Sequence, residues 1–118
     1  MFINFSNHNS SSWSDEQITA AKAYGNIEDL SFPSIDPKAT KEDIQNLAVL
    51  YVNKIMSLSP ACVMCQGEFC FSYAVINLLK ERGIQVVAAC SERVVQEEKI
   101  GNETKRVSIF KFIQFREY

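Results

Sequence analysis

The sequence predicts an α/β fold with a mainly parallel sheet between two layers of helices. Along residues 1–90, short apolar segments alternate with segments of helical spacing, which is typical of parallel strands joined by right-handed crossovers. Residues 61–65 are apolar throughout and residues 84–89 are apolar apart from Gln85, as expected for central strands that are covered on both faces. A chain of 118 residues matches one ordinary domain, so we expect a single domain over residues 1–118.

The first part of the chain predicts two strands and the helix between them. Residues 2–5 are apolar apart from Asn4 and give way to a polar segment, so we expect the first strand there. Ser14 is followed three residues later by Gln17, a capping box that marks the start of a helix. Gly25 is expected to end this helix. Residues 27–32 form the second predicted strand, and the prolines after it predict a loop.

Two further helices and two strands follow. Thr40 is expected to begin a helix that keeps one apolar face until Pro60. Residues 61–65 are the third predicted strand, and the next helix is expected to end at Gly83. Residues 84–89 are the fourth strand. The predicted order of the four strands in the sheet is 2-1-3-4, in a three-layer, Rossmann-like arrangement.

The last part of the chain departs from this alternation. Residues 90–93 are expected to form a loop that closes the fourth strand. Residues 94–99 and 105–115, separated by Gly101 and Asn102, predict a C-terminal β-hairpin that extends the sheet at one edge. Its second strand is apolar on both faces, whereas an edge strand normally has one solvated face. We therefore expect a homodimer in which a partner subunit covers this strand.

Composition and charge exclude several classes of protein. The net charge of −2 argues against a binder of long duplex nucleic acid, which needs clustered Lys and Arg. We expect no membrane partner and a cytoplasmic location, because the N-terminus lacks a signal-peptide pattern and no apolar run approaches a membrane span. Reduced thiols are expected there. Cys62 and Cys65 spell CxxC, but their side chains would point to opposite faces of a strand, so we expect both in the core.

Three segments follow predicted strands and should meet in one cleft, because ligands of open α/β sheets bind beyond the carboxyl ends of the strands. The first segment offers amide and hydroxyl donors, one imidazole and one stacking surface. These candidate ligand-binding residues are Asn7, Ser10, Ser11, Ser12 and Trp13, with His8 as a candidate proton acceptor. Two interpretations stay open for this segment, since it can also be an ordinary serine-rich loop in which Trp13 packs as a hydrophobic staple.

The other two segments each allow two interpretations. Gln66, Gly67 and Glu68 precede a helix, so Glu68 is either a catalytic carboxylate or a helix cap. In the segment Ser91, Glu92 and Arg93, the guanidinium either holds a phosphate or pairs with Glu92. Cys90 is a minor candidate for a nucleophile. No spacing of His, Cys, Asp or Glu indicates a metal site, and no cofactor is predicted.

The loop NHNSSSW, the turn QGE and the segment ACSER, in this order of elements, resemble the small CARF-like proteins of type III CRISPR systems. The resemblance implies a dimer that binds cyclic oligoadenylate, and for the ring nucleases among them a metal-independent cleavage of it. Ser10, Ser11 and Ser12 would then hold phosphate, Gln66 and Gly67 would contact the ligand, and Arg93 would stabilise charge, with His8 and Glu68 as proton-transfer candidates. Two alternatives are a non-catalytic ligand sensor and a regulatory subunit that binds another protein.

Overall fold

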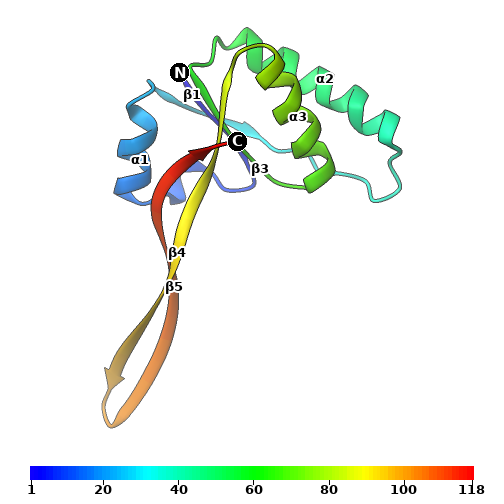
Figure 1. Ribbon diagram of the computed structural model, residues 1–118. Coiled ribbons are helices and arrows are strands. Elements are labelled where there is room, and N and C mark those ends of the chain that lie inside the picture. Colours follow the sequence, from blue (N-terminus) through cyan, green and yellow to red (C-terminus); the bar gives the residue numbers. More distant parts are fainter.

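The structure, a computed structural model of residues 1–118, contains one five-stranded sheet with the order β2-β1-β3-β4-β5 (Figure 1). Its strands are β1 (Phe2–Ser6), β2 (Ile27–Ser31), β3 (Cys62–Gln66), β4 (Gln85–Ile100) and β5 (Glu103–Glu117). The first four run parallel to their neighbours, and β5 is antiparallel to β4. The predicted α/β class, the core order 2-1-3-4 and the hairpin at the sheet edge are therefore confirmed.

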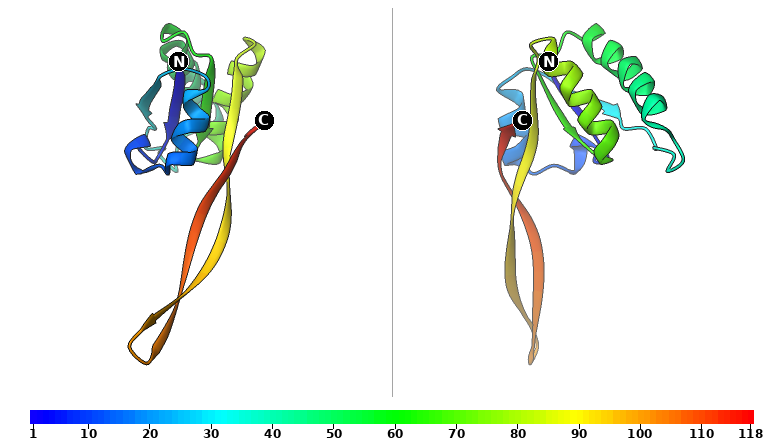
Figure 2. Two further views of the ribbon diagram at one scale, coloured as in Figure 1. Left: turned by 90° about the vertical axis from the view of Figure 1, so that its left-hand side faces the viewer. Right: turned by 45° about the vertical axis from the view of Figure 1, so that its right-hand side comes forward.

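Helices cover both faces of the sheet: α1 (Asp15–Lys22) lies on one face, and α2 (Lys41–Ser57) and α3 (Phe69–Glu81) lie on the other (Figures 1 and 2). Each of the two predicted N-caps is confirmed, since Ser14 Oγ accepts from the amide of Gln17 and Thr40 forms a capping box.

The capping box expected at Ser14 is only half formed. The side chain of Gln17 does not return to the backbone at Ser14 but extends to Met64 Sδ at 3.9 Å. Gly83 follows α3 with a φ of 75°, a left-handed conformation that glycine adopts without strain, so the predicted end of this helix is also confirmed.

The core has two parts, one on each face of the sheet. The larger part lies under α2 and α3, and the smaller one lies under α1. Cys65 belongs to the first and Cys62 to the second, which confirms that the CxxC side chains are core residues on opposite faces. Burial raises the pKa of Cys62 to about 11 and that of Cys65 to about 12, so neither thiol is a reactive nucleophile at neutral pH.

The loop expected at residues 90–93 does not exist, because β4 continues through them to Ile100. β5 pairs with β4 along its length, with one register shift between Cys90 and Ser91. No glycine or proline interrupts this segment of β4. Ile113 of β5 has no partner at the register shift, so the extra residue forms a bulge and the pairing continues beyond it.

The far part of the hairpin leaves the body of the molecule as a two-stranded ribbon (Figures 1 and 2). The radius of gyration is 17.0 Å, whereas a compact chain of this length would have roughly 13–14 Å. Gly101 turns the ribbon with a φ of 64°. Several apolar side chains on the hairpin are exposed, among them Val95, Ile100, Ile109 and Phe110. No helix is both long and apolar enough to cross a membrane.

Candidate functional site

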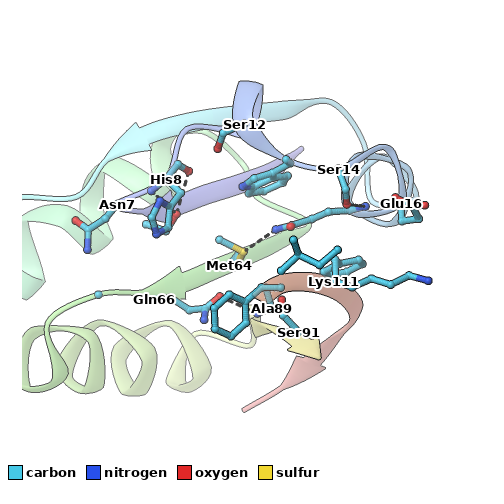
Figure 3. Close-up of a pocket in the computed structure, with 17 residues that line it drawn as sticks. Asn7, His8, Ser12, Ser14, Glu16, Met64, Gln66, Ala89, Ser91 and Lys111 are labelled. Atoms are coloured by element: carbon cyan, nitrogen blue, oxygen red, sulfur yellow. Dashed lines mark hydrogen bonds between the residues drawn. The ribbon is translucent and has the colours of Figure 1, made fainter. Parts of the chain in front are cut away.

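A cavity of about 710 Å³ lies where β1 and β3 end, between α1 and the base of the hairpin (Figure 3). We call it the α1 cleft. Seventeen residues from the ends of these strands, the α1 region and the hairpin base line it. They are Ser6, Asn7, His8, Ser12, Trp13, Ser14, Glu16, Gln17, Met64, Gln66, Gly67, Ala89, Ser91, Ile109, Phe110, Lys111 and Phe112.

The structure brings seven of the sequence-predicted site residues together in this cleft. They come from the loop after β1, the end of β3 and the part of β4 beside its register shift with β5, and they are Asn7, His8, Ser12, Trp13, Gln66, Gly67 and Ser91. The other predicted residues do not line the cleft, and they are Ser10, Ser11, Glu68, Glu92 and Arg93. Cys90 is half-buried and does not line it either. The loop after β1 and the end of β3 therefore build the site, while the expected third loop is replaced by the hairpin base.

A buried polar network holds the loop after β1 in place. Asn4, in the middle of β1, donates from Nδ2 to the backbone oxygen of His8 and to Asp29 Oδ1, both at 2.7 Å. Ser6 Oγ donates to Asn4 Oδ1 at 2.7 Å. Asn4 is only 2% exposed, and a buried polar side chain is costly unless it is hydrogen-bonded. These bonds both satisfy Asn4 and fix the backbone at His8.

Asp29, on β2, anchors the same loop at Ser10, two residues after His8. It accepts from the amide of Ser10 at 3.0 Å and from the hydroxyl of Ser10 at 2.7 Å. Burial by itself would raise the pKa of Asp29, but the hydrogen bonds from Asn4 and Ser10 together outweigh it and lower the pKa below 3.8. Ser10, expected to hold phosphate, is thus committed to Asp29. Asn4 and Asp29 were not predicted to support the site, although each is a polar residue within a predicted strand.

The lowered pKa of Asp29 predicts a pH-dependent contribution to stability. A carboxyl group with a folded pKa below its unfolded value stabilises the fold above the unfolded pKa, and this stabilisation is lost as the pH falls through the folded pKa. We therefore expect Asp29→Asn to unfold at lower denaturant concentration than the wild type at pH 7. The difference should shrink as the pH falls below about 4. Urea titrations across this range measure it, and a difference that is independent of pH would contradict the assigned role of the carboxylate.

Trp13 packs on the α1 face of the sheet and also lines the cleft. Its ring packs edge-on against Phe2, with the ring centroids 6.2 Å apart and the planes at 80°, and it also contacts Phe115 at 6.3 Å. The side chain is half-buried and lines the α1 cleft. It is therefore a packing residue of the α1 face whose ring stays partly exposed.

Gln66 and Gly67 mark the end of β3. Gln66 Oε1 accepts from the amide of Ala89 at 2.7 Å and so continues the pairing of β3 with β4 beyond the last backbone bond. Its Nε2 has no hydrogen-bond partner within the chain, and the residue lines the cleft. A Cβ at Gly67 would overlap the ring of Phe32, so glycine is required here for close packing.

Glu68 and Arg93 have structural roles away from the cleft. Glu68 is the N-cap of α3, since its Oε1 accepts from the amides of Cys70 and Phe71. Arg93 lies on the hairpin and donates from Nε and one terminal nitrogen to Ser108 Oγ, at 3.1 and 3.0 Å. The three expected catalytic groups are thus dispersed: His8 lines the cleft, and the other two do not.

Lys111 and Glu16 are the lining residues with a full charge that the sequence analysis did not single out. In Figure 3 they lie toward one end of the α1 cleft, and Asn7 and His8 lie toward the other. Lys111 is paired across the hairpin with Glu92. In the sequence, a lysine within the largely apolar strand VSIFKFIQF is the feature that could have indicated Lys111 as a site residue. No group of three His, Cys, Asp or Glu side chains lies close enough together to hold a metal ion.

Comparison with known proteins places nearly the whole chain in one family. The family model described as "Uncharacterized protein MJ1673 family" matches residues 1–116. Neither a search of curated proteins nor a search of solved structures finds a match.

Proposed function

We propose that this chain, which belongs to the MJ1673 family, binds a small phosphate-containing nucleotide in the α1 cleft, with cyclic oligoadenylate as the candidate ligand. The position of the cleft carries the proposal. It lies beyond the carboxyl ends of β1 and β3, where ligands bind in Rossmann-like sheets. Its volume of about 710 Å³ falls in the range of small-molecule sites. A role in CRISPR-type antiviral signalling is part of this proposal.

The lining of the cleft suits the parts of a nucleotide. Trp13 and Phe110 offer aromatic surface to a base, and Phe110 is 76% exposed. Asn7, Ser12 and the free Nε2 of Gln66 offer hydrogen-bond donors. Lys111 supplies the cationic group for a phosphate. It takes the part that the sequence analysis gave to Arg93.

The same arrangement favours binding over cleavage. Metal-independent cleavage of a phosphodiester by the attack of a ribose hydroxyl needs a proton acceptor and a charge-stabilising donor at the reacting atoms. Of the three groups expected to supply them, His8 lines the cleft, while Glu68 caps α3 and Arg93 bonds to Ser108. We therefore propose a ligand sensor as the primary function.

Replacing Lys111 by alanine is expected to weaken the binding of cyclic tetra-adenylate by about 1.5–3 kcal/mol, because a charge-assisted hydrogen bond to phosphate is lost. Isothermal titration calorimetry measures the change. Arg93→Ala is the matched control, since it removes the same charge from the hairpin outside the cleft. Equal losses for the two variants would indicate a general electrostatic effect and contradict the assigned site. Measurable product formation that His8→Ala abolishes would contradict a pure sensor.

A second candidate function, binding of a second copy through the hairpin, is favoured by the exposed apolar surface of the ribbon. Isolated two-stranded hairpins are marginal in water, yet this one exposes Val95 and Ile100 outside the α1 cleft. Covering this surface on both chains would stabilise the ribbon and account for an edge strand that is apolar on both faces. We therefore propose the homodimer that the sequence analysis expected.

Sedimentation at micromolar concentration is expected to give about twice the chain mass of 13.4 kDa. Val95→Glu should shift the protein toward the monomer, because it places a charge on a surface that the dimer would desolvate. Glu97→Gln, an exposed polar change on the same strand, serves as the control. A wild-type protein that stays monomeric at these concentrations would rule out the dimer.

A further inference from the structure

A second groove lies next to the α1 cleft and shares two residues with it. This groove, of about 500 Å³, runs between α3 and the C-terminal Tyr118, and we call it the α3 groove. Gln66 and Gly67 line both the α3 groove and the α1 cleft. The two hollows are therefore neighbours at the carboxyl end of β3, and a ligand that fills one reaches the border of the other.

Two unpartnered aromatic rings line the α3 groove. Phe69 is 90% exposed and Tyr73 is 70% exposed, although both are large side chains. They are four residues apart in α3, so they lie on the same face of the helix. Neither ring packs against another aromatic ring, whereas Phe71 between them packs on Phe5 and Phe32. Their exposure leaves a flat apolar surface beside the shared residues.

The α3 groove also carries a cation. Lys80 lines it at the end of α3 remote from Phe69. Exposed aromatic rings in a row with a nearby Lys or Arg are the features by which proteins bind single-stranded nucleic acid, because bases stack on the rings and phosphates contact the cation. The α1 cleft has the same pair of features in Trp13, Phe110 and Lys111.

We propose that the α3 groove is a second nucleotide subsite, so that the ligand is an oligonucleotide of at least two nucleotides rather than a mononucleotide. The ligand would cross from the α1 cleft over Gln66 and Gly67 and stack a further base on the surface that Phe69 and Tyr73 form together. This inference rests on the proposed function of the α1 cleft. It assigns a role to two rings on the face of the sheet opposite to α1, where the sequence analysis placed no site residue.

The test compares two probes, adenosine 5′-monophosphate and cyclic tetra-adenylate, by isothermal titration calorimetry. Phe69→Ala and Tyr73→Ala are expected to weaken the binding of cyclic tetra-adenylate by roughly 5- to 150-fold, the loss that follows from one unstacked base. Binding of the monophosphate should not change. Leu50→Ala, which removes an exposed apolar side chain from α2, is the matched control and should change neither. Thermal unfolding midpoints are expected to stay at the wild-type value in all three variants.

The two proposals fail in different ways. If Lys111→Ala weakens cyclic tetra-adenylate binding but Phe69→Ala and Tyr73→Ala do not, the second subsite is wrong and the α1 cleft stands. If the wild type binds neither probe at millimolar concentration, both proposals are wrong. If Phe69→Ala lowers the sedimenting mass and leaves nucleotide affinity unchanged, the rings belong to a protein interface and the subsite is overturned.

Discussion

Replacing Phe5 by alanine is expected to lower the free energy of unfolding by about 3–5 kcal/mol, the cost of removing a fully buried phenyl ring. Phe5 is 0% exposed in the central strand β1. Its ring lies 4.9 Å from that of Phe32, 5.4 Å from that of Tyr51 and 6.0 Å from that of Phe71. Alanine would leave a cavity among three rings held by different elements, so the neighbours can fill it only in part. Guanidinium or urea titration measures the loss.

Phe69→Ala is the matched control, because it removes the same side chain from a surface position. An exposed change of this kind is expected to alter the free energy of unfolding by no more than about 0.5 kcal/mol. A loss below about 1 kcal/mol for Phe5→Ala would mean that the aromatic cluster does not hold α2 and α3 against the sheet.

Replacing Asn4 by alanine is expected to cost about 2–3 kcal/mol, because it removes the shorter of the two hydrogen bonds to the backbone oxygen of His8 and a hydrogen bond to the charged carboxylate of Asp29. It should also release the loop at residues 7–12, which bears the cleft residues Asn7, His8 and Ser12. Faster hydrogen exchange at the amides of Ser10 and Ser12 and weaker binding of cyclic tetra-adenylate are the expected signs. Urea titration gives the stability change.

Ser6→Ala is the matched control for Asn4→Ala. It removes a polar side chain from β1 but keeps the hydrogen bonds that Asn4 Nδ2 donates. Ser6 Oγ bonds to Asn4 Oδ1 and to the backbone oxygen of His8, but its removal keeps both bonds made by Asn4 Nδ2. We expect it to cost about 1 kcal/mol and to leave the loop protected from exchange. If Asn4→Ala and Ser6→Ala behave alike, Asn4 is a buried polar residue of the strand and does not position the loop.

The elements that were predicted correctly have local causes. Ser14 and Thr40 begin helices because each side chain caps amides three residues ahead, and Gly83 ends one because it adopts a positive φ. The apolar runs at residues 61–65 and 84–89 required cover on both faces, so their central place in a parallel sheet followed. Such signals lie within a few residues of each other and need no knowledge of distant contacts.

About half of the candidate site was within reach of the sequence. The rule that ligands bind beyond the carboxyl ends of parallel strands selected the loop after β1 and the end of β3, and both line the α1 cleft. The rule does not say which side chains turn inward. Ser10 turns to Asp29 and Glu68 turns to the amides of α3, because each finds a hydrogen-bond partner within the chain.

The hairpin shows what only the tertiary structure decided. Residues 90–93 carry polar side chains and read locally as a loop, but β5 supplies hydrogen-bond partners along the whole segment and keeps it a strand. The bulge between Cys90 and Ser91 then sets the register of the ribbon. In a strand, a shift of one residue turns every side chain to the other face, so this bulge helps decide which hairpin side chains face the cleft. Local patterns thus determined the strands and helices, and the rule for Rossmann-like sheets gave the strand order. Pairing with a segment about 20 residues away decided that Lys111, and not Arg93, lines the cleft.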